Sequence, residues 1–265
     1  MRIPRRRSLP AVRSSRQRRA RPCQNPRKPR EGSAIATVLV TGANKGIGLE
    51  FCRQLHARGD RVVATCRRPS PELGALPARI LEDIDVTSDA SCARLARTLA
   101  GVALDWLVLN AGVFESSGFG KLDFDRMAYE YDVDALGPLR VAQALAGNLA
   151  AGAKIALVAS RAGSIGDNAS GGNYGYRMAK AALNMAGVTL ARDLHARGVA
   201  VVMLHPGVVD TDLFRFAERS LGRMVRAGDA VTPAVAVRDM LPRIDELTLE
   251  TSGRFLHRNG QVLPW

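Results

Sequence analysis

The stretch ATVLVTGANKGIGLEFCRQLHARG, residues 36–59, decides the fold of this chain. It begins with the short apolar run ATVLV, continues through a glycine-rich loop, and then repeats apolar side chains at Ile47, Phe51 and Leu55 before Gly59. Apolar residues four positions apart lie on one face of a helix, and glycine commonly ends one. The stretch therefore predicts a buried strand, a tight turn and a helix.

The loop TGANKGIG at 41–48 has the spacing of a phosphate-binding turn. Gly42 permits the tight turn, Gly46 lets a pyrophosphate approach the backbone, and Gly48 allows close packing of the helix. The N-terminus of that helix attracts the phosphates. A plain tight turn is the alternative, but the strand and the helix on either side favour a nucleotide-binding role.

The rest of the chain alternates strand-like and helix-like patterns. Strand patterns follow at 61–66, 78–86, 103–110, 153–160, 199–205 and 254–257, and helix patterns at 88–101, 123–150, 174–197 and from Thr232 and Pro233 onward. Continuously apolar strands separated by helices are typical of a parallel sheet that is covered on both faces. We therefore expect an α/β protein with a single-domain Rossmann fold, and Pro242 should kink or end the last helix.

Composition excludes several classes of protein. The chain has 265 residues, of which 46% are hydrophobic, 24% charged and 5% aromatic, as expected for a soluble globular protein rather than a disordered or disulfide-stapled one. No apolar run reaches the roughly 18 residues that a membrane-spanning helix needs. Cys23, Cys52, Cys66 and Cys92 form no CxxC pair and no metal-binding spacing. Reduced thiols, no metal and a cytoplasmic location are predicted.

The net charge of +13 is concentrated at the N-terminus. Residues 1–30 hold twelve of the 38 Lys and Arg residues and no acidic residue, so the remainder is nearly neutral, with 26 basic against 25 acidic side chains. We expect residues 1–32 to be a disordered basic arm and residues 33–265 to form the domain. A solvated arm is favoured over a nucleic-acid tether or a transit peptide, because no aromatic residue interleaves the arginines and prolines break a helix. An error in start-site assignment is a further alternative.

The second strand indicates which dinucleotide binds. An acidic residue at its end would bind the adenosine ribose of NAD, but Arg67 stands there, 19 positions after Gly48, and Arg68 follows. A guanidinium would hold the 2′-phosphate of NADPH, and Lys45 in the glycine loop would add a second positive charge. NADPH is therefore favoured over NADH. The alternative is that both are ordinary surface arginines.

A second group of residues predicts acid-base chemistry. Tyr176 and Lys180 are four positions apart on a predicted helix, so their side chains share one face. Ser160 ends the fifth strand, at the edge of the sheet where open α/β folds bind ligands. Tyr174 is left out of this role, because Met178 stands four positions after it.

With these motifs in one order, residues 34–265 resemble the short-chain dehydrogenase/reductase family. The resemblance is carried by TGANKGIG, DV at 85–86, LNAG at 109–112, YRMAK at 176–180 and HPGVVDT at 205–211. It implies that Tyr176 is the general acid in carbonyl reduction and the base in the reverse direction. Lys180 and the oxidised nicotinamide would favour tyrosinate, and Ser160 would hydrogen-bond the substrate oxygen.

The resemblance also implies a set of cofactor contacts. Lys180 would bind the nicotinamide ribose, and further contacts would be made to the adenine by Asp85 and Val86, to the adenosine side by Asn110, Ala111 and Gly112, and to the carboxamide by Pro206, Val209 and Thr211. The full predicted set is Gly42, Asn44, Lys45, Gly46, Ile47, Gly48, Arg67, Asp85, Val86, Asn110, Ala111, Gly112, Tyr176, Lys180, Pro206, Gly207, Val209 and Thr211. Structural alternatives are that Asn110 only caps a strand and that Pro206 and Gly207 only form a turn.

Two features depart from the family pattern. Asp134 occupies the position of an asparagine that orders a water next to the lysine, and we expect it to take over that role in the catalytic set with a shifted pH profile. The loop GDNASGG at 166–172 lengthens the gap between Ser160 and Tyr176. This loop and the ending GRFLHRNGQVLPW resemble C-factor-like and sniffer-like carbonyl reductases.

The sequence thus predicts NADPH-dependent reduction of a small ketone or aldehyde. A non-catalytic cofactor-binding sensor is the alternative, as is a protein that binds nucleic acid through its arm. The segment after Thr211 has an apolar face and, opposite it, a basic face. This pattern predicts either a substrate lid or an amphipathic surface helix. The apolar residues are Leu213, Phe214, Ala217, Leu221 and Met224, and the basic residues are Arg215, Arg219, Arg223 and Arg226. By resemblance, a homodimer or homotetramer would form through the helices at 123–150 and 174–197.

Overall fold

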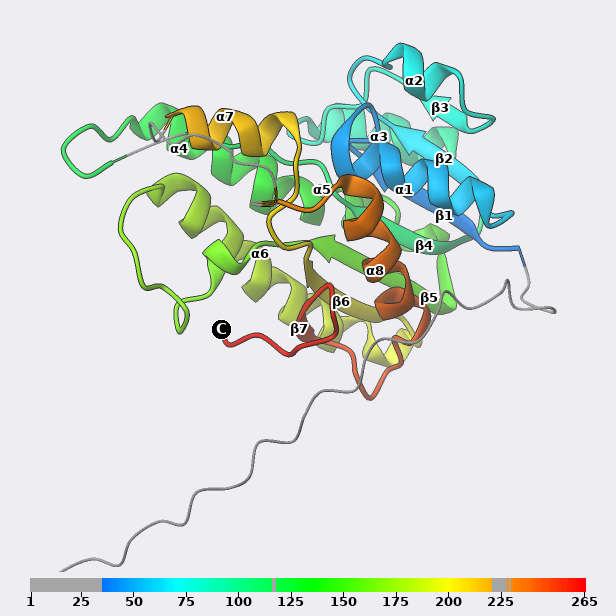
Figure 1. The fold of residues 1–265 in the computed structure, drawn as a ribbon. Helices are drawn as coiled ribbons and strands as arrows, with labels where there is room; N and C mark the ends of the chain where they lie inside the picture. The colour runs from blue at the N-terminus through cyan, green and yellow to red at the C-terminus, as the bar shows by residue number, and fades with distance from the viewer. Residues whose placement is uncertain (1–34, 116–117, 221–227, 229) are drawn as a thin grey trace, which may run out of the picture. The chain divides into compact units, whose positions relative to one another are not determined.

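The architecture is one parallel sheet between two layers of helices (Figure 1). The computed structural model describes residues 35–115, 118–220, 228 and 230–265, so the predicted arm at 1–32 lies outside the described residues. Within these ranges seven strands pair in parallel in the order β3-β2-β1-β4-β5-β6-β7. Their bounds are β1 Thr37–Thr41, β2 Arg61–Thr65, β3 Arg79–Leu81, β4 Leu104–Leu109, β5 Leu149–Val158, β6 Ala200–His205 and β7 Arg254–His257. The predicted doubly wound Rossmann fold is confirmed.

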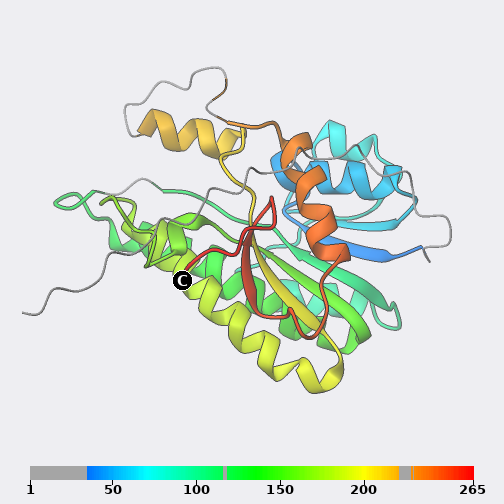
Figure 2. The same ribbon diagram turned by 60° about the horizontal axis from the view of Figure 1, so that its bottom comes forward.

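Helices cover both faces of the sheet. They are α1 Gly46–Ala57, α2 Pro71–Gly74, α3 Asp89–Thr98, α4 Phe124–Tyr131, α5 Gly137–Ala144, α6 Tyr174–Asp193, α7 Asp212–Ser220 and α8 Pro233–Asp245, with a π turn at Asp132–Leu136 and single 3-10 turns at Ala146–Asn148, Arg161–Gly163 and His195–Arg197. Figure 2 shows α1 and α8 on one side of the sheet and α6 on the other. None of the helices in the described ranges is long and apolar enough to cross a membrane.

Alternating side chains of each strand build two separate cores. Val38 and Val40 of β1 pack with Phe51 of α1 and Val237 of α8, whereas Leu39 faces the layer of α3, α5 and α6. Both cores are fully buried at these positions. Because successive strand residues point to opposite faces, a continuously apolar run is what a sheet covered on both sides requires.

The structure corrects three predicted elements. The helix expected at 123–150 is interrupted, because Gly137 N–H donates to the carbonyl of Asp132 five residues back and Pro138 has no N–H to continue the α pattern. It ends at Ala144, and β5 begins at Leu149. The strand expected at 78–86 stops at Leu81, before Asp83 with a φ of 58°. Pro242 neither ends nor breaks α8, which continues to Asp245.

Topology places the candidate site. The chain crosses from one side of β1 to the other between β3 and β4, so the carboxyl ends of β1 and β4 diverge above a crevice. The loops that follow β1, β4, β5 and β6 all open into this crevice. Together with the segments after β2 and β3, which bring Arg67 and Asp85, these loops carry the motifs singled out in the sequence.

Candidate active site

One cleft of about 480 Å³ collects the predicted site residues. Its lining includes Ser160, Tyr176, Lys180 and Asp134, together with Gly42, Asn44, Lys45, Gly46, Ile47, Arg67, Asp85, Val86, Asn110, Ala111, Gly112, Pro206, Gly207, Val209 and Thr211. Gly48 is the one predicted residue outside the lining, because it is buried under the loop. Residues from the segments that follow β1 to β6 therefore meet at a single site with residues of α6 and the π turn.

The glycine loop is shaped for close approach of a ligand to the backbone. Gly42 and Gly46 have φ values of 64° and 56°, which L side chains rarely adopt. A Cβ on Gly48 would lie 2.2 Å from the carbonyl oxygen of Gly42, so only glycine lets α1 start directly beneath the loop. The N-terminus of α1 then faces the cleft, and the residues present fit a dinucleotide pyrophosphate.

Asn110 supports this loop rather than reaching freely into the cleft. Its Nδ2 donates to the carbonyl oxygens of Thr41, at 3.0 Å, and Gly42, at 3.3 Å. Its backbone N–H donates to Thr41 Oγ1. The side chain therefore holds the ends of β1 and β4 together, as the structural alternative expected, while the residue still lines the cleft.

Positive side chains stand at the end of the cleft that the segments after β1 and β2 form. Arg67 is exposed, and it helps to lower the pKa of Asp85, a carboxylate that mainly accepts from the N–H and hydroxyl of Thr87. Lys45 pairs with Asp212 at 3.4 Å in an exposed contact across the cleft. An exposed pair of this kind is weak, so Lys45 stays available to an anionic ligand.

The acid-base residues come from β5 and α6. Ser160 follows the end of β5 and accepts a hydrogen bond from Ala162 N–H, whereas Tyr176 and Lys180 lie one turn apart on α6. Lys180 Nζ is 5.6 Å from the centre of the Tyr176 ring. Tyr174 points elsewhere, since it contacts Phe119 and does not line the cleft.

Asp134 is fully buried against Lys180. The two side chains form an ion pair, with Asp134 Oδ2 3.2 Å from Lys180 Nζ, while Asp134 Oδ1 accepts from Val113 N–H at 2.8 Å. A Cβ on Gly112 would lie 3.1 Å from the same carboxylate, so glycine leaves room for it. An acidic residue thus stands where the family pattern has a neutral amide; burial raises its pKa, although Lys180 and the N–H of Val113 oppose this.

Burial and charge act in opposite directions on these groups. Burial raises the pKa of Tyr176, and Asp134 raises it further, while Lys180 and a hydrogen bond with Ser160 lower it; the net direction is upward. Burial lowers the pKa of Lys180, but Asp134, Tyr176 and Glu130 together more than offset this effect and the pKa is raised. Lys180 lowers the pKa of Tyr176, as expected, but this effect is smaller than the combined effect of burial and the groups that raise it.

Comparison with known proteins places the chain. The short chain dehydrogenase family matches residues 36–221. The chain belongs to the short-chain dehydrogenase/reductase family. This confirms the resemblance found in the motifs, and the protein is accordingly an oxidoreductase.

Two relatives of this dehydrogenase/reductase are each 43% identical to it over the residues that align. One is 1-hydroxy-2-glutathionyl-2-methyl-3-butene dehydrogenase from Rhodococcus sp. (strain AD45), aligned over 235 residues that cover 87% of this chain and 100% of the relative. The other is C-signal from Myxococcus xanthus, aligned over 169 residues that cover 61% and 93%. The expected similarity to C-factor-like proteins is therefore present.

Two solved structures are similar over 88% of this dehydrogenase/reductase and 100% of their own chains. An NADPH-bound carbonyl reductase from chicken fatty liver superposes with a TM-score of 0.78 at 31% identity. Carbonyl reductase Sniffer of D. melanogaster superposes with a TM-score of 0.77 at 25% identity. The predicted resemblance to sniffer-like carbonyl reductases is confirmed.

Sequence reasoning missed two residues of this site. The ring of Phe114 meets that of Tyr176 edge-on at 5.2 Å between centroids and that of Phe216, on α7, at 6.5 Å. Its position two residues after the LNAG motif was an available signal. Glu130 lies fully buried behind the cleft, and no motif marks it.

The segment after Thr211 is described only in part. Thr211 Oγ1 accepts from Phe214 N–H and so begins α7. Leu213, Phe214 and Ala217 line the cleft, which agrees with the apolar face expected there. Leu221, Arg223, Met224 and Arg226 of the same prediction lie outside the described residues.

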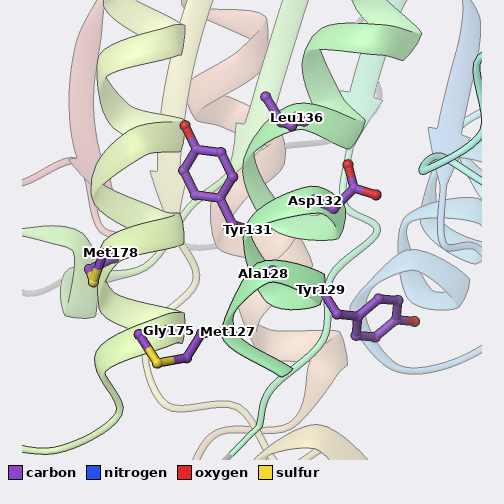
Figure 3. A pocket seen from close by; sticks show the side chains of 8 residues that line it. All are labelled: Met127, Ala128, Tyr129, Tyr131, Asp132, Leu136, Gly175 and Met178. Carbon is purple, nitrogen blue, oxygen red and sulfur yellow. The ribbon is translucent and has the colours of Figure 1, made fainter. Parts of the chain in front are cut away.

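A second hollow lies between α4 and α6, outside the cleft. Figure 3 shows Met127 of α4 reaching toward Gly175 of α6, with Tyr131 and Met178 nearby. Tyr131 and Met178 are 42% and 57% exposed. The predicted association of two or four chains through these helices stays a prediction.

Proposed function

We propose that this protein reduces a small ketone or aldehyde to an alcohol with NADPH. The observation that carries the proposal is that Ser160, Tyr176 and Lys180 line the same cleft as the glycine loop and Arg67. The reaction needs both acid-base residues and dinucleotide-binding residues within reach of one substrate. The similarity to the chicken carbonyl reductase, which holds NADPH, supports the same cofactor.

Each residue has its own part in this reaction. When bound, NADPH supplies the hydride that forms the new C–H bond. Tyr176 transfers its hydroxyl proton to the carbonyl oxygen, and Ser160 donates a hydrogen bond to that oxygen as negative charge develops on it. Lys180, as an ammonium held by Asp134, stabilises the tyrosinate that remains.

The state of Tyr176 favours reduction. Burial and Asp134 hold the pKa of Tyr176 above its ordinary value, so its hydroxyl is protonated at neutral pH. Reduction needs this protonated form, whereas oxidation of an alcohol needs tyrosinate. Phe114 adds an apolar wall beside Tyr176, which suits an uncharged carbonyl substrate.

The test is oxidation of NADPH and of NADH by the full chain with a panel of aldehydes, ketones and quinones. Turnover with NADPH should exceed turnover with NADH and should fall by about 1,000-fold or more in Tyr176→Phe, because the general acid is lost. Tyr174→Phe is the matched control, since it removes the same hydroxyl two residues earlier and outside the cleft.

Two results would contradict this function. Equal losses in Tyr174→Phe and Tyr176→Phe would remove Tyr176 from the chemistry. Tight NADPH binding without turnover on any carbonyl would instead support a cofactor-binding sensor.

A further inference from the structure

Glu130, in the last turn of α4, is a carboxylic acid with no exposed surface. Its Oε1 accepts from the N–H of Glu115 at 2.7 Å, whereas Oε2 has no hydrogen-bond partner among the residues that the structure describes. A Cβ on Gly175 would lie 2.1 Å from Oε2, so the carboxyl group fits the α4–α6 contact only because α6 has glycine there. Gly175 directly precedes Tyr176.

Glu130 acts together with Asp134. The two carboxyl groups lie four residues apart and accept from the backbone N–H groups of Glu115 and Val113, respectively. These two bonds flank Phe114, whose ring contacts Tyr176. The two acids therefore hold the segment around Phe114 through hydrogen bonds from the backbone N–H groups on either side of it. This segment forms one wall of the cleft. We call Glu130 and Asp134 the carboxylate clamp.

The charges around the clamp are unbalanced. Glu130 is influenced by Asp134 on the π turn, by Glu115 on the loop and by Lys180 and Tyr176 on α6. Of these only Lys180 is a cation, and it is paired with Asp134, while Arg126 of α4 forms an ion pair with Glu115 at 2.9 Å. Burial, with the two neighbouring carboxylates, raises the pKa of Glu130 to about 7, although the N–H of Glu115 and Lys180 oppose this. Its charge therefore changes close to neutral pH.

We propose that Glu130 is a positioning residue of this active site, which holds the wall that carries Phe114 and, through its charge, adds to the effect of Asp134 on how readily Lys180 and Tyr176 exchange protons. The second half of this assignment rests on the proposed reductase function. It extends the site beyond the Ser160, Tyr176 and Lys180 set to a group that touches neither substrate nor cofactor.

The first test is the pH profile of kcat/KM for carbonyl reduction by Glu130→Gln. Glutamine still accepts from Glu115 N–H but carries no charge. Ionised Glu130 raises the pKa of Tyr176, so its removal lowers that pKa, and the alkaline limb of the profile should move to lower pH by about 0.5 to 1 pH unit. KM at acidic pH should stay within about twofold of the wild-type value, because the clamp is intact.

Asp132→Asn is the matched control. It makes the same carboxylate-to-amide change two residues along the same helical run, at a partly exposed side chain that pairs with Arg140. Its profile should superimpose on that of the wild type. If the profile of Glu130→Gln also superimposes, the assignment is wrong.

A second measurement does not depend on activity. Infrared difference spectra of the protein without substrate should show a protonated carboxyl band that disappears as the pH rises through about 7. The band should be present in Asp132→Asn and absent in Glu130→Gln. Its persistence in Glu130→Gln would overturn the assignment, whereas a correct band without carbonyl turnover would leave Glu130 as assigned and refute only the reductase function.

Discussion

At the scale of single residues, we predict that cofactor choice depends on Arg67. It is exposed at the end of the cleft, beside Asp85, and nothing in the described part of the chain pairs with it by an ion pair. Arg67→Ala should raise KM for NADPH by about 10- to 100-fold, because a charge-assisted bond to a phosphate is worth roughly 1.5 to 3 kcal/mol. KM for NADH should change by less than about twofold, and steady-state kinetics with both cofactors measures the difference.

Arg53→Ala supplies the control for this prediction. Arg53 is an exposed arginine on α1 that contacts Glu50 and does not line the cleft. Its removal changes the net charge equally but leaves the adenosine end intact. The role of Arg67 would be refuted if both variants changed KM for NADPH to the same extent.

Individual residues also show what the sequence can and cannot predict about this site. The motif residues fall in one cleft because each stands at the carboxyl end of a strand or on the helix that follows, and parallel topology brings those ends together. Glu130 belongs to no motif. Its place in the site follows from its contacts with Glu115 and Gly175, which are 15 and 45 positions away in the chain. The hydrogen bonds of Asn110 likewise depend on the meeting of β1 and β4.

At the scale of elements, strands were easier to predict than the helix at 123–150. Buried parallel strands are continuously apolar, so their existence is written locally in the sequence. The π turn after Tyr131 includes the backbone bond from Gly137 N–H to the carbonyl of Asp132, and Pro138 has no N–H to donate. The π turn places Asp134 against Lys180. The amphipathic pattern of this segment is the same as that of a regular helix, so the sequence does not reveal the π turn.

The π turn therefore leads to a prediction for Asp134→Asn. Asparagine still accepts from Val113 N–H, so the turn should persist, but the negative charge 3.2 Å from Lys180 is lost. The pKa values of Lys180 and Tyr176 both fall, because Asp134 raises each of them. The alkaline limb of the kcat profile for reduction should move to lower pH by about one pH unit or more.

This shift should exceed that of Glu130→Gln, because Asp134 is in direct contact with Lys180. An unchanged kcat profile in Asp134→Asn would show that the carboxylate does not influence the proton exchange of the site. Circular dichroism of the variant checks that the helical run has not been lost.

At the scale of the whole molecule, two buried titrating groups act in opposite directions on stability. Glu130 holds its proton up to about pH 7 in the folded state, against an ordinary pKa near 4.5, so its contribution to folding weakens as pH rises between these values. Burial lowers the pKa of His205 to about 3, so folding is penalised as pH falls from about 6.5 toward that value. Between about pH 4.5 and 6.5 the two effects oppose each other.

Removal of Glu130 should isolate its own contribution to the pH dependence of stability. Relative to wild type, the free energy of unfolding of Glu130→Gln should increase by about 3 kcal/mol between pH 4.5 and 7.5. Each tenfold difference in proton affinity between the folded and unfolded states corresponds to about 1.4 kcal/mol. All other groups titrate equally in the two proteins, so their contributions cancel in the comparison. Urea unfolding of both proteins across this range measures it, with Asp132→Asn as the control whose difference from wild type should vary little with pH. A difference for Glu130→Gln that is equally flat would mean that Glu130 is ionised in the folded protein throughout the range, and the clamp would then carry two negative charges against one lysine.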